Sequence, residues 1–156
     1  MHWRHFCDCI AQLAEGIGAQ RVVLLGAFLA DVVYSLPVEV TGFASDGKLL
    51  ESLGVARSGY EGPTGIVGLL SDRLQREGLD VLSLWASLPH YLNASHNPRG
   101  TLALIDKLAQ YLGITFDDAE LRAEAEAFEK QISEIVAADP ELSDYVKELK
   151  RRDFAQ

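Results

Sequence analysis

The chain has no long apolar run, and its first residues lack the features of an export signal. No uninterrupted apolar stretch in its 156 residues approaches the ~20 residues that a membrane-spanning helix requires. The N-terminal sequence MHWRHFCDCI has no basic start followed by an apolar core and a small-residue cleavage site. We therefore predict no transmembrane segment and a cytoplasmic location.

Cysteine is scarce, and its placement does not suggest a disulfide or a metal site. Cys7 and Cys9 would face different directions on a helix, so we predict two reduced, partly buried thiols. His2, His5 and Cys9 could share one helical face, and zinc accepts such ligands. No fourth ligand is in view, and solvated histidines at the start of a helix are the commoner explanation. We predict no metal and no cofactor.

Basic residues are few. The chain has 14 Lys and Arg against 23 Asp and Glu, a net charge of −9, and residues 117–148 hold almost all of the acidic excess. A nucleic-acid-binding surface normally shows a basic patch. The one candidate, KELKRRD at 147–153, favours the C-terminal end of a helix instead. We predict no nucleic-acid partner.

Helical and strand patterns alternate over residues 1–116. Apolar residues at helical spacing predict a helix over 3–16, with Phe6, Ile10, Leu13 and Ile17 on its apolar face. RVVLLG at 21–26 is typical of a strand buried on both faces of a parallel sheet, and 37–44 predicts a second strand, near an edge because of Pro37. The further predicted elements are a short helix in 46–54, a strand at 55–60, a helix from Ile66 to Gly78, a strand at 79–86, and a helix from Pro98 to Gly113 with Asn97 as its N-cap.

The last forty residues show a different pattern, with no strand between two helices. Apolar residues step by 4, 3, 4 and 3 from Leu121 to Ile135, and Asp139-Pro140 begins a second helix. Such a narrow stripe suits packing against a partner helix; alternatively, both helices simply cover the body. We predict an α/β fold, an αβα sandwich with a mostly parallel sheet in 1–116, followed by a helical hairpin in 117–156.

The GPTG turn at 62–65 has the ingredients of an anion site. Glycines let the backbone approach a ligand, and a helix N-terminus offers free N–H groups. Thr64 can cap the helix or donate its hydroxyl. The turn matches neither the P-loop nor the dinucleotide-binding pattern, so a strand-to-helix bend that needs glycine for its geometry is the plainer interpretation.

Ligands of open α/β sheets bind beyond the carboxyl ends of the strands. That rule would gather the loop 26–31, the glycine turn and the loop 87–98. The candidate ligand-binding residues are Asp31, Gly62, Thr64, Gly65, His90, Tyr91 and Asn97. No spacing marks a catalytic triad or a nucleophile elbow, so we predict no catalytic residue. His90 and Tyr91 can equally be packing residues, and Asn97 already serves as an N-cap.

Three segments together resemble the PAC2 family, the proteasome assembly chaperone family, and most closely its actinobacterial branch. They are VVLLGAFLADVVYSLPVEVTGFASD, the stretch from YEGPTG through LWASLPHYL to NPRGTLALI, and DPELSDYVKELKRRD. The resemblance runs over nearly the whole chain. It implies an αβα core of nucleoside phosphorylase-like topology, a C-terminal helical appendage and a tendency to oligomerise.

The resemblance also implies a function, with two departures. No enzymatic activity is established for this branch, and eukaryotic relatives assemble proteasome α-subunits. Some members dock the proteasome with a hydrophobic-Tyr-any residue tail, whereas this chain ends RRDFAQ. Members carry further strands before the helix that begins here at Trp3, so we expect 1–116 to lack them and to leave a sheet edge that needs a partner.

Two functional hypotheses follow. The first is a non-catalytic, chaperone-like assembly or interaction protein that forms a homo-oligomer and has protein partners. The second is an enzyme or sensor that binds a small anion or a nucleoside at the Gly62–Gly65 turn.

Overall fold

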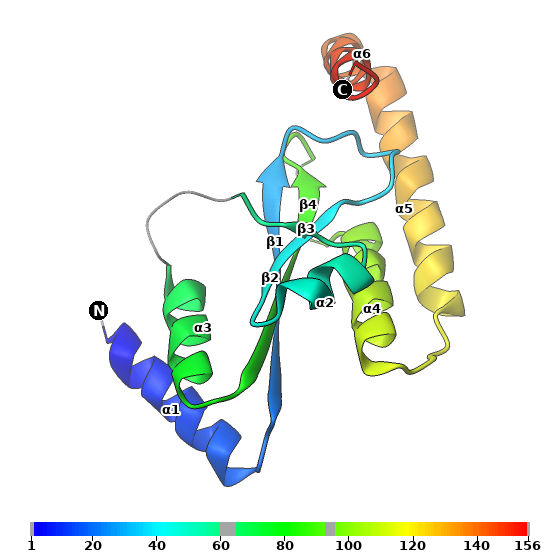
Figure 1. Cartoon of the computed structure of the whole chain (residues 1–156). Helices are drawn as coiled ribbons and strands as arrows, with labels where there is room; N and C mark the ends of the chain where they lie inside the picture. The colour runs from blue at the N-terminus through cyan, green and yellow to red at the C-terminus, as the bar shows by residue number, and fades with distance from the viewer. Residues whose placement is uncertain (1, 60–64, 93–95, 156) are drawn as a thin grey trace. The chain divides into compact units, whose positions relative to one another are not determined.

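The computed structural model describes residues 2–59, 65–92 and 96–155. Within the described residues there are six helices and four strands, which Figure 1 labels in chain order. None of these helices is long and apolar enough to cross a membrane. The elements are α1 (Trp3–Gly16), β1 (Arg21–Ala30), β2 (Val40–Ala44), α2 (Gly47–Ser52), β3 (Ala56–Arg57), α3 (Ile66–Arg76), β4 (Asp80–Pro89), α4 (Pro98–Leu112), α5 (Ala119–Ala138) and α6 (Pro140–Asp153).

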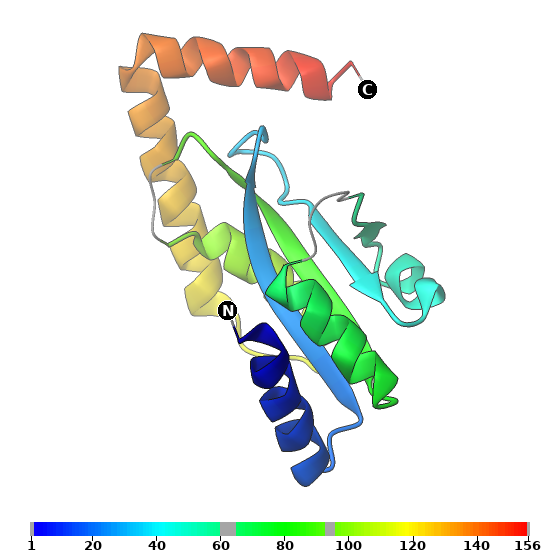
Figure 2. The same ribbon diagram turned by 90° about the vertical axis from the view of Figure 1, so that its left-hand side faces the viewer.

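The strands form one sheet in the order β1-β4-β2-β3. β1 and β4 run side by side in the same direction (Figures 1 and 2), with backbone bonds from Asp80 to Gln20 and from His90 to Ala30. β2 and β3 are also parallel. β4 and β2 are antiparallel, because Ser45 bonds to Val81 while Ser87 bonds to Glu39. The predicted α/β class with a mostly parallel sheet, followed by a helical hairpin, is confirmed.

The first strand differs from its prediction in length and in burial. It continues through Gly26 to Ala30, because this glycine admits the neighbouring tryptophan rather than ending the strand. A Cβ on Gly26 would lie 2.7 Å from ring carbons of Trp85. The prediction that both faces are buried was wrong. β1 stands at one end of the strand order, and Leu25 and Leu29 are exposed, Leu29 by 67%.

The other strands also depart from their predicted bounds. β2 begins at Val40, beyond Pro37, and lies between β4 and β3 rather than at an edge. Since Pro37 is outside the ladder, its missing N–H costs no bond there. β3 holds only two residues of the predicted 55–60, and Tyr60 lies outside the described residues. β4 continues beyond residue 86 to Pro89.

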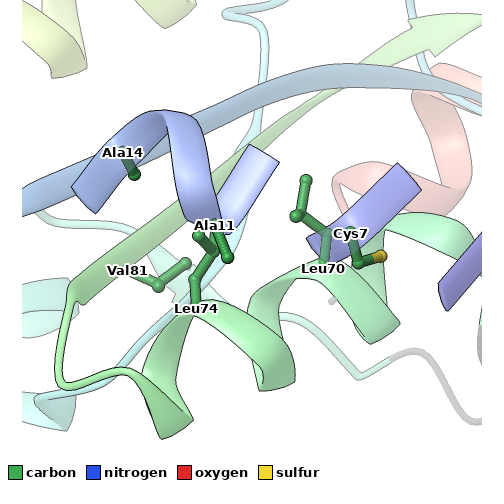
Figure 3. Packing of buried hydrophobic residues seen from close by; sticks show 6 residues of the cluster. All are labelled: Cys7, Ala11, Ala14, Leu70, Leu74 and Val81. Carbon is green, nitrogen blue, oxygen red and sulfur yellow. The ribbon is translucent and has the colours of Figure 1, made fainter. Parts of the chain in front are cut away.

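The chain divides into two compact units, residues 1–26 with 41–85, and residues 27–40 with 86–156. The predicted division into 1–116 and 117–156 remains a prediction. In the first unit, α1 packs against α3 over a cluster of buried side chains (Figure 3). The cluster consists of Cys7, Ala11, Ala14, Leu70, Leu74 and Val81.

The helix α1 has the predicted bounds but buries a different face. Its small residues Cys7, Ala11 and Ala14 are buried, whereas Phe6 and Leu13 are exposed. Small side chains let α1 and α3 approach closely, and the ion pair from Arg73 to Asp8 (2.8 Å) links the two helices beside that contact. Both cysteines are free thiols, Cys7 buried and Cys9 exposed.

In the second unit, α4 has the predicted caps. Asn97 accepts a hydrogen bond from the Gly100 backbone N–H (3.0 Å), Pro98 occupies the first turn, and Gly113 ends the helix at φ 66°. A left-handed cap of this kind favours glycine. Asp139 likewise caps α6 by accepting from the backbone N–H groups of residues 141 and 142.

The hairpin of α5 and α6 shares a core with the loop that follows β1. Its buried members are Val33, Ile132, Val136, Val146 and Leu149. The apolar stripe predicted from Leu121 to Ile135 is wrong at its last residue, since Ile135 is exposed and Val136 is buried instead. A straight helix has 3.6 residues per turn, so a 4-3-4-3 pattern drifts around its surface. The apolar faces of α5 and α6 are thus used within the chain, as the covering interpretation expects.

Candidate functional site

Two predicted site residues meet where β1 and β4 end. Because these strands are parallel and finish at Ala30 and Pro89, the residues that follow, Asp31 and His90, lie side by side. The His90 Nδ1 is 3.1 Å from the Asp31 Oδ1 and 3.3 Å from the Ala30 carbonyl oxygen. Two acceptors face this nitrogen, so both contacts are hydrogen bonds when Nδ1 carries a proton.

Three rings join this pair to α6. His90, Tyr91 and Tyr145 lie edge to face with one another, with centroids 5.5–5.8 Å apart, the spacing that favours such rings. The Tyr145 hydroxyl donates to the Asp31 carboxylate at 3.3 Å. The cluster therefore attaches the second helix of the hairpin to the ends of the two strands.

The hydroxyl of Tyr91 is fully engaged with the loop after β1. It donates to the Val32 carbonyl (3.0 Å) and accepts from the Tyr34 backbone N–H (3.0 Å). The Tyr34 hydroxyl in turn donates to Ser133 of α5 (3.1 Å). A hydroxyl that already donates and accepts in this way holds the backbone in place.

Arg99 is a central residue of the site that sequence reasoning missed. Its guanidinium donates to the carbonyl oxygens of Tyr34 and of Leu36, the latter at 2.7 Å, and pairs with Glu129 of α5 (2.8 Å). The side chain is only 15% exposed. One signal was available: a cation in the first turn of a helix opposes the helix dipole, which indicates that a specific partner holds it there.

A cavity of about 300 Å³ lies beside this network. Asp31 and Asn97 line it, together with Ser87, Arg99 and Arg152 among others. Asn97 is also the N-cap of α4. The structure thus brings Asp31, His90 and Tyr91 together, and both Asp31 and Asn97 line the cavity.

The rule for the carboxyl ends of parallel strands does not bring the glycine turn to this cluster. β3 runs parallel to β2, and β2 runs against β4, so the carboxyl end of β3 does not share an edge with that of β4. Gly62 and Thr64 lie outside the described residues, and Gly65 is the N-cap of α3 in the first unit. Ligand binding by the seven candidate residues remains a prediction.

These contacts form one polar network that holds the loop after β1 and the hairpin together, and we call it the brace. Tyr91 and Arg99 direct their polar atoms at the backbone of residues 32–36. From the hairpin, Tyr145 donates to Asp31, just before that segment, and Glu129 pairs with Arg99. Among the described residues, no three His, Cys, Asp or Glu side chains gather closely enough to hold a metal ion. The network can fix the loop and the hairpin.

Two tyrosines of this network are expected to lose their phenolic protons at a higher pH than an exposed tyrosine does. Burial raises the pKa of Tyr91, and desolvation together with the Asp31 carboxylate raises the pKa of Tyr145. Both phenols hold their protons more tightly in the folded chain. Their contribution to stability is therefore complete below the ordinary value of about 10 and is lost as the pH rises above it.

A near-ultraviolet absorbance titration of the folded chain measures this directly. Of the five tyrosines, two should ionise above the pH at which the unfolded chain ionises, and Tyr91→Phe should remove one of them. Thermal stability should fall as the pH rises beyond about 10. A single titration step at the ordinary pKa would show that the two phenols are not held as described.

A family model described as the PAC2 family matches residues 1–136. The chain belongs to the PAC2 family. The match includes β1, β4 and the start of the hairpin, and it ends before α6. No protein with a curated description matches the chain.

Solved structures place this PAC2-family chain among actinobacterial members. A PAC2 family protein from Streptomyces avermitilis is 38% identical, with a TM-score of 0.81, and the match covers 94% of this chain and 61% of that one. A Mycobacterium tuberculosis protein described as a proteasome-assembly chaperone homologue is 38% identical, with a TM-score of 0.82 and coverage of 94% and 62%. The predicted family resemblance is confirmed.

An archaeal member is similar at lower identity. Pyrococcus furiosus PbaA, described as an archaeal homolog of proteasome-assembly chaperone, is 25% identical, with a TM-score of 0.66 and coverage of 85% of this chain and 60% of that one. This PAC2-family chain therefore spans about three fifths of the length of the relatives it matches.

Proposed function

We propose that this PAC2-family chain is a non-catalytic protein that assists the assembly of other proteins, with proteasome subunits as the partner class. The observation that carries the proposal is the 38% identity to a proteasome-assembly chaperone homologue over 94% of the chain. The proposal places the protein in the cytoplasm. With a net charge of −9, protein surfaces are better partners for it than nucleic acids.

The candidate site supports a structural role for its polar residues. The Tyr91 hydroxyl and the Arg99 guanidinium bind backbone carbonyls of the chain itself, where a substrate-binding group would keep its polar atoms for the ligand. The rival hypothesis, a small-anion or nucleoside-binding enzyme or sensor, depends on the Gly62–Gly65 turn. That turn lies mostly outside the described residues, and no observation favours the rival.

Reconstitution tests the proposed function. Separately purified proteasome α- and β-subunits from the source organism are mixed with and without the full chain, and native mass spectrometry follows the assembly. We expect faster formation of the complete particle, intermediates that contain this chain, and its absence from the finished particle. An unrelated acidic protein at the same concentration is the control. An unchanged time course with no complex would refute the proposal.

A further inference from the structure

The hydroxyl of Ser87 is buried and has no partner within the described part of the chain. Ser71, Ser83 and Ser87 are the buried polar side chains there. Ser71 donates to the Val67 carbonyl, and Ser83 accepts from the indole N–H of Trp85. Ser87 is only 4% exposed, and its hydroxyl bonds to none of the described residues. Buried polar groups are normally satisfied, so this hydroxyl calls for a partner from outside the fold.

The Ser87 hydroxyl opens into the cavity beside the brace. Every side-chain oxygen or nitrogen of the described residues that is closed off completely has a hydrogen-bond partner. Because the Ser87 hydroxyl has none, it must reach open space, and the space that Ser87 lines is this cavity. Pro89, two positions further along β4, projects to the same face of the strand and lines the cavity too.

The cavity walls carry an excess of negative charge. Three acidic and two basic residues line it, namely Asp31, Glu39, Asp153, Arg99 and Arg152. Both cations already have a carboxylate outside the lining, because Arg99 pairs with Glu129 (2.8 Å) and Arg152 with Glu148 (3.2 Å). Asp31 receives its bonds from His90 and Tyr145 at Oδ1 alone. The cavity therefore attracts cations and repels phosphates and other anions.

The spacing of the carboxylates indicates what kind of cation fits. Asp31 follows β1, Glu39 precedes β2, and Asp153 ends α6. These three do not gather closely enough to share one metal ion. The wall between them is apolar and includes Val33, Leu36, Phe128 and Leu149. A ligand that neutralises such a wall carries several positive charges separated by apolar segments.

The cavity also has a direction. Glu39 and Asp153 are exposed and lie at its open side, whereas Ser87 is buried. The volume of about 300 Å³ is at the lower end of the range for small-molecule sites. A narrow, flexible chain can therefore reach from the carboxylates at the mouth to the hydroxyl at the buried side.

We propose that this cavity binds an aliphatic polyamine. Its ammonium groups donate to the carboxylates of Asp31, Glu39 and Asp153, and one of them donates to the Ser87 hydroxyl oxygen, which has lone pairs to accept. Its methylene segments contact the apolar wall. The site is separate from the glycine turn, takes the opposite charge from the ligand considered there, and is independent of the proposed assembly function.

Isothermal titration calorimetry of the full chain with spermidine tests the site. The wild type should show saturable binding of one molecule per chain. Ser87→Ala should weaken that binding by about tenfold, because an ammonium group loses its hydrogen-bond acceptor at the buried end. Since the hydroxyl has no partner within the described residues, the ligand-free variant should melt at the wild-type temperature.

A matched pair of double variants tests the charges. Glu39→Gln with Asp153→Asn removes two carboxylates of the lining and should also weaken binding by about tenfold. Glu120→Gln with Glu134→Gln removes the same charge from exposed residues of α5 outside the lining and should leave the affinity unchanged. Magnesium chloride at the same ionic strength, and a diol of similar chain length, should show no saturable binding.

Three results would overturn the proposal. The first is a wild type that does not bind spermidine saturably, and the second is equal affinity in the wild type and in Ser87→Ala. The third is an equal loss in the two double variants, because spermidine would then be responding to the net charge of −9 rather than to this cavity. None of these results would change the outcome of the reconstitution assay, so the two proposals stand or fall separately.

Discussion

Replacing Arg99 with methionine is expected to lower the free energy of unfolding by about 2–4 kcal/mol, chiefly because backbone carbonyls lose a charged donor, while the broken ion pair to the 40% exposed Glu129 adds less. The guanidinium is largely buried and donates to the carbonyls of Tyr34 and Leu36 while it pairs with Glu129. Methionine fills much of the same volume but donates nothing. Two carbonyls and a carboxylate would then lose their partner.

Chemical denaturation followed by far-ultraviolet circular dichroism measures this loss. Arg122 provides the matched control, since it forms ion pairs with Asp106 and Asp118 in the same unit but is half exposed. Surface pairs of this kind contribute little, so Arg122→Met should leave the unfolding curve almost unchanged. Equal effects of the two substitutions would show that Arg99 does not brace the loop.

Replacing Leu74 with alanine is expected to cost about 3–5 kcal/mol. Its side chain has no exposed surface and lies in the core of the first unit with Ala11, Ala14 and Val81 (Figure 3). The alanines of α1 beside it have no side-chain atoms beyond Cβ that could move into the space. A cavity that cannot collapse gives a cost toward the upper end of the range.

The matched control lies on the same helix. Leu69 is 36% exposed, so Leu69→Ala removes less buried surface and should cost about 1–2 kcal/mol, clearly less than Leu74→Ala. Both variants are compared with the wild type by thermal and denaturant unfolding at low protein concentration. Similar losses for the two leucines would contradict the burial pattern of α3 and the placement of the core.

Elements with strong local signals could be predicted from the sequence. The bounds of α1 and α4 follow from apolar periodicity and from glycine or asparagine at the ends, because a cap bonds only to its own neighbours. The turn at Asp139-Pro140 is predictable for the same reason. These features depend on residues within a few positions of one another.

Features that depend on distant residues could not be predicted. The sequence shows that α1 is amphipathic, but not that its small residues rather than its large ones face α3. Gly26 has the pattern of a strand end, yet the structure uses it to admit Trp85. In each case the contact that decides the outcome comes from another element, from α3 for the buried face of α1 and from Trp85 of β4 for Gly26.

The candidate site shows the same limit. Asp31 and His90 follow two apolar runs, and the rule for carboxyl ends of parallel strands brings them together. Tyr145 lies 114 positions from Asp31, and no local pattern connects the two. The glycine turn was grouped with them on the assumption that β3 runs with β4, and the antiparallel pairing of β2 and β4 removes that reason.

Hydrogen–deuterium exchange of the native wild type and of Arg99→Met tests most directly whether the polar network holds the loop and the hairpin. In Arg99→Met, amides of residues 33–39 and of α6 should exchange about tenfold faster or more, while those of α1 keep their wild-type rates. Unchanged exchange in the loop and in α6 would contradict the brace, and those polar residues would then have to be explained by a bound ligand.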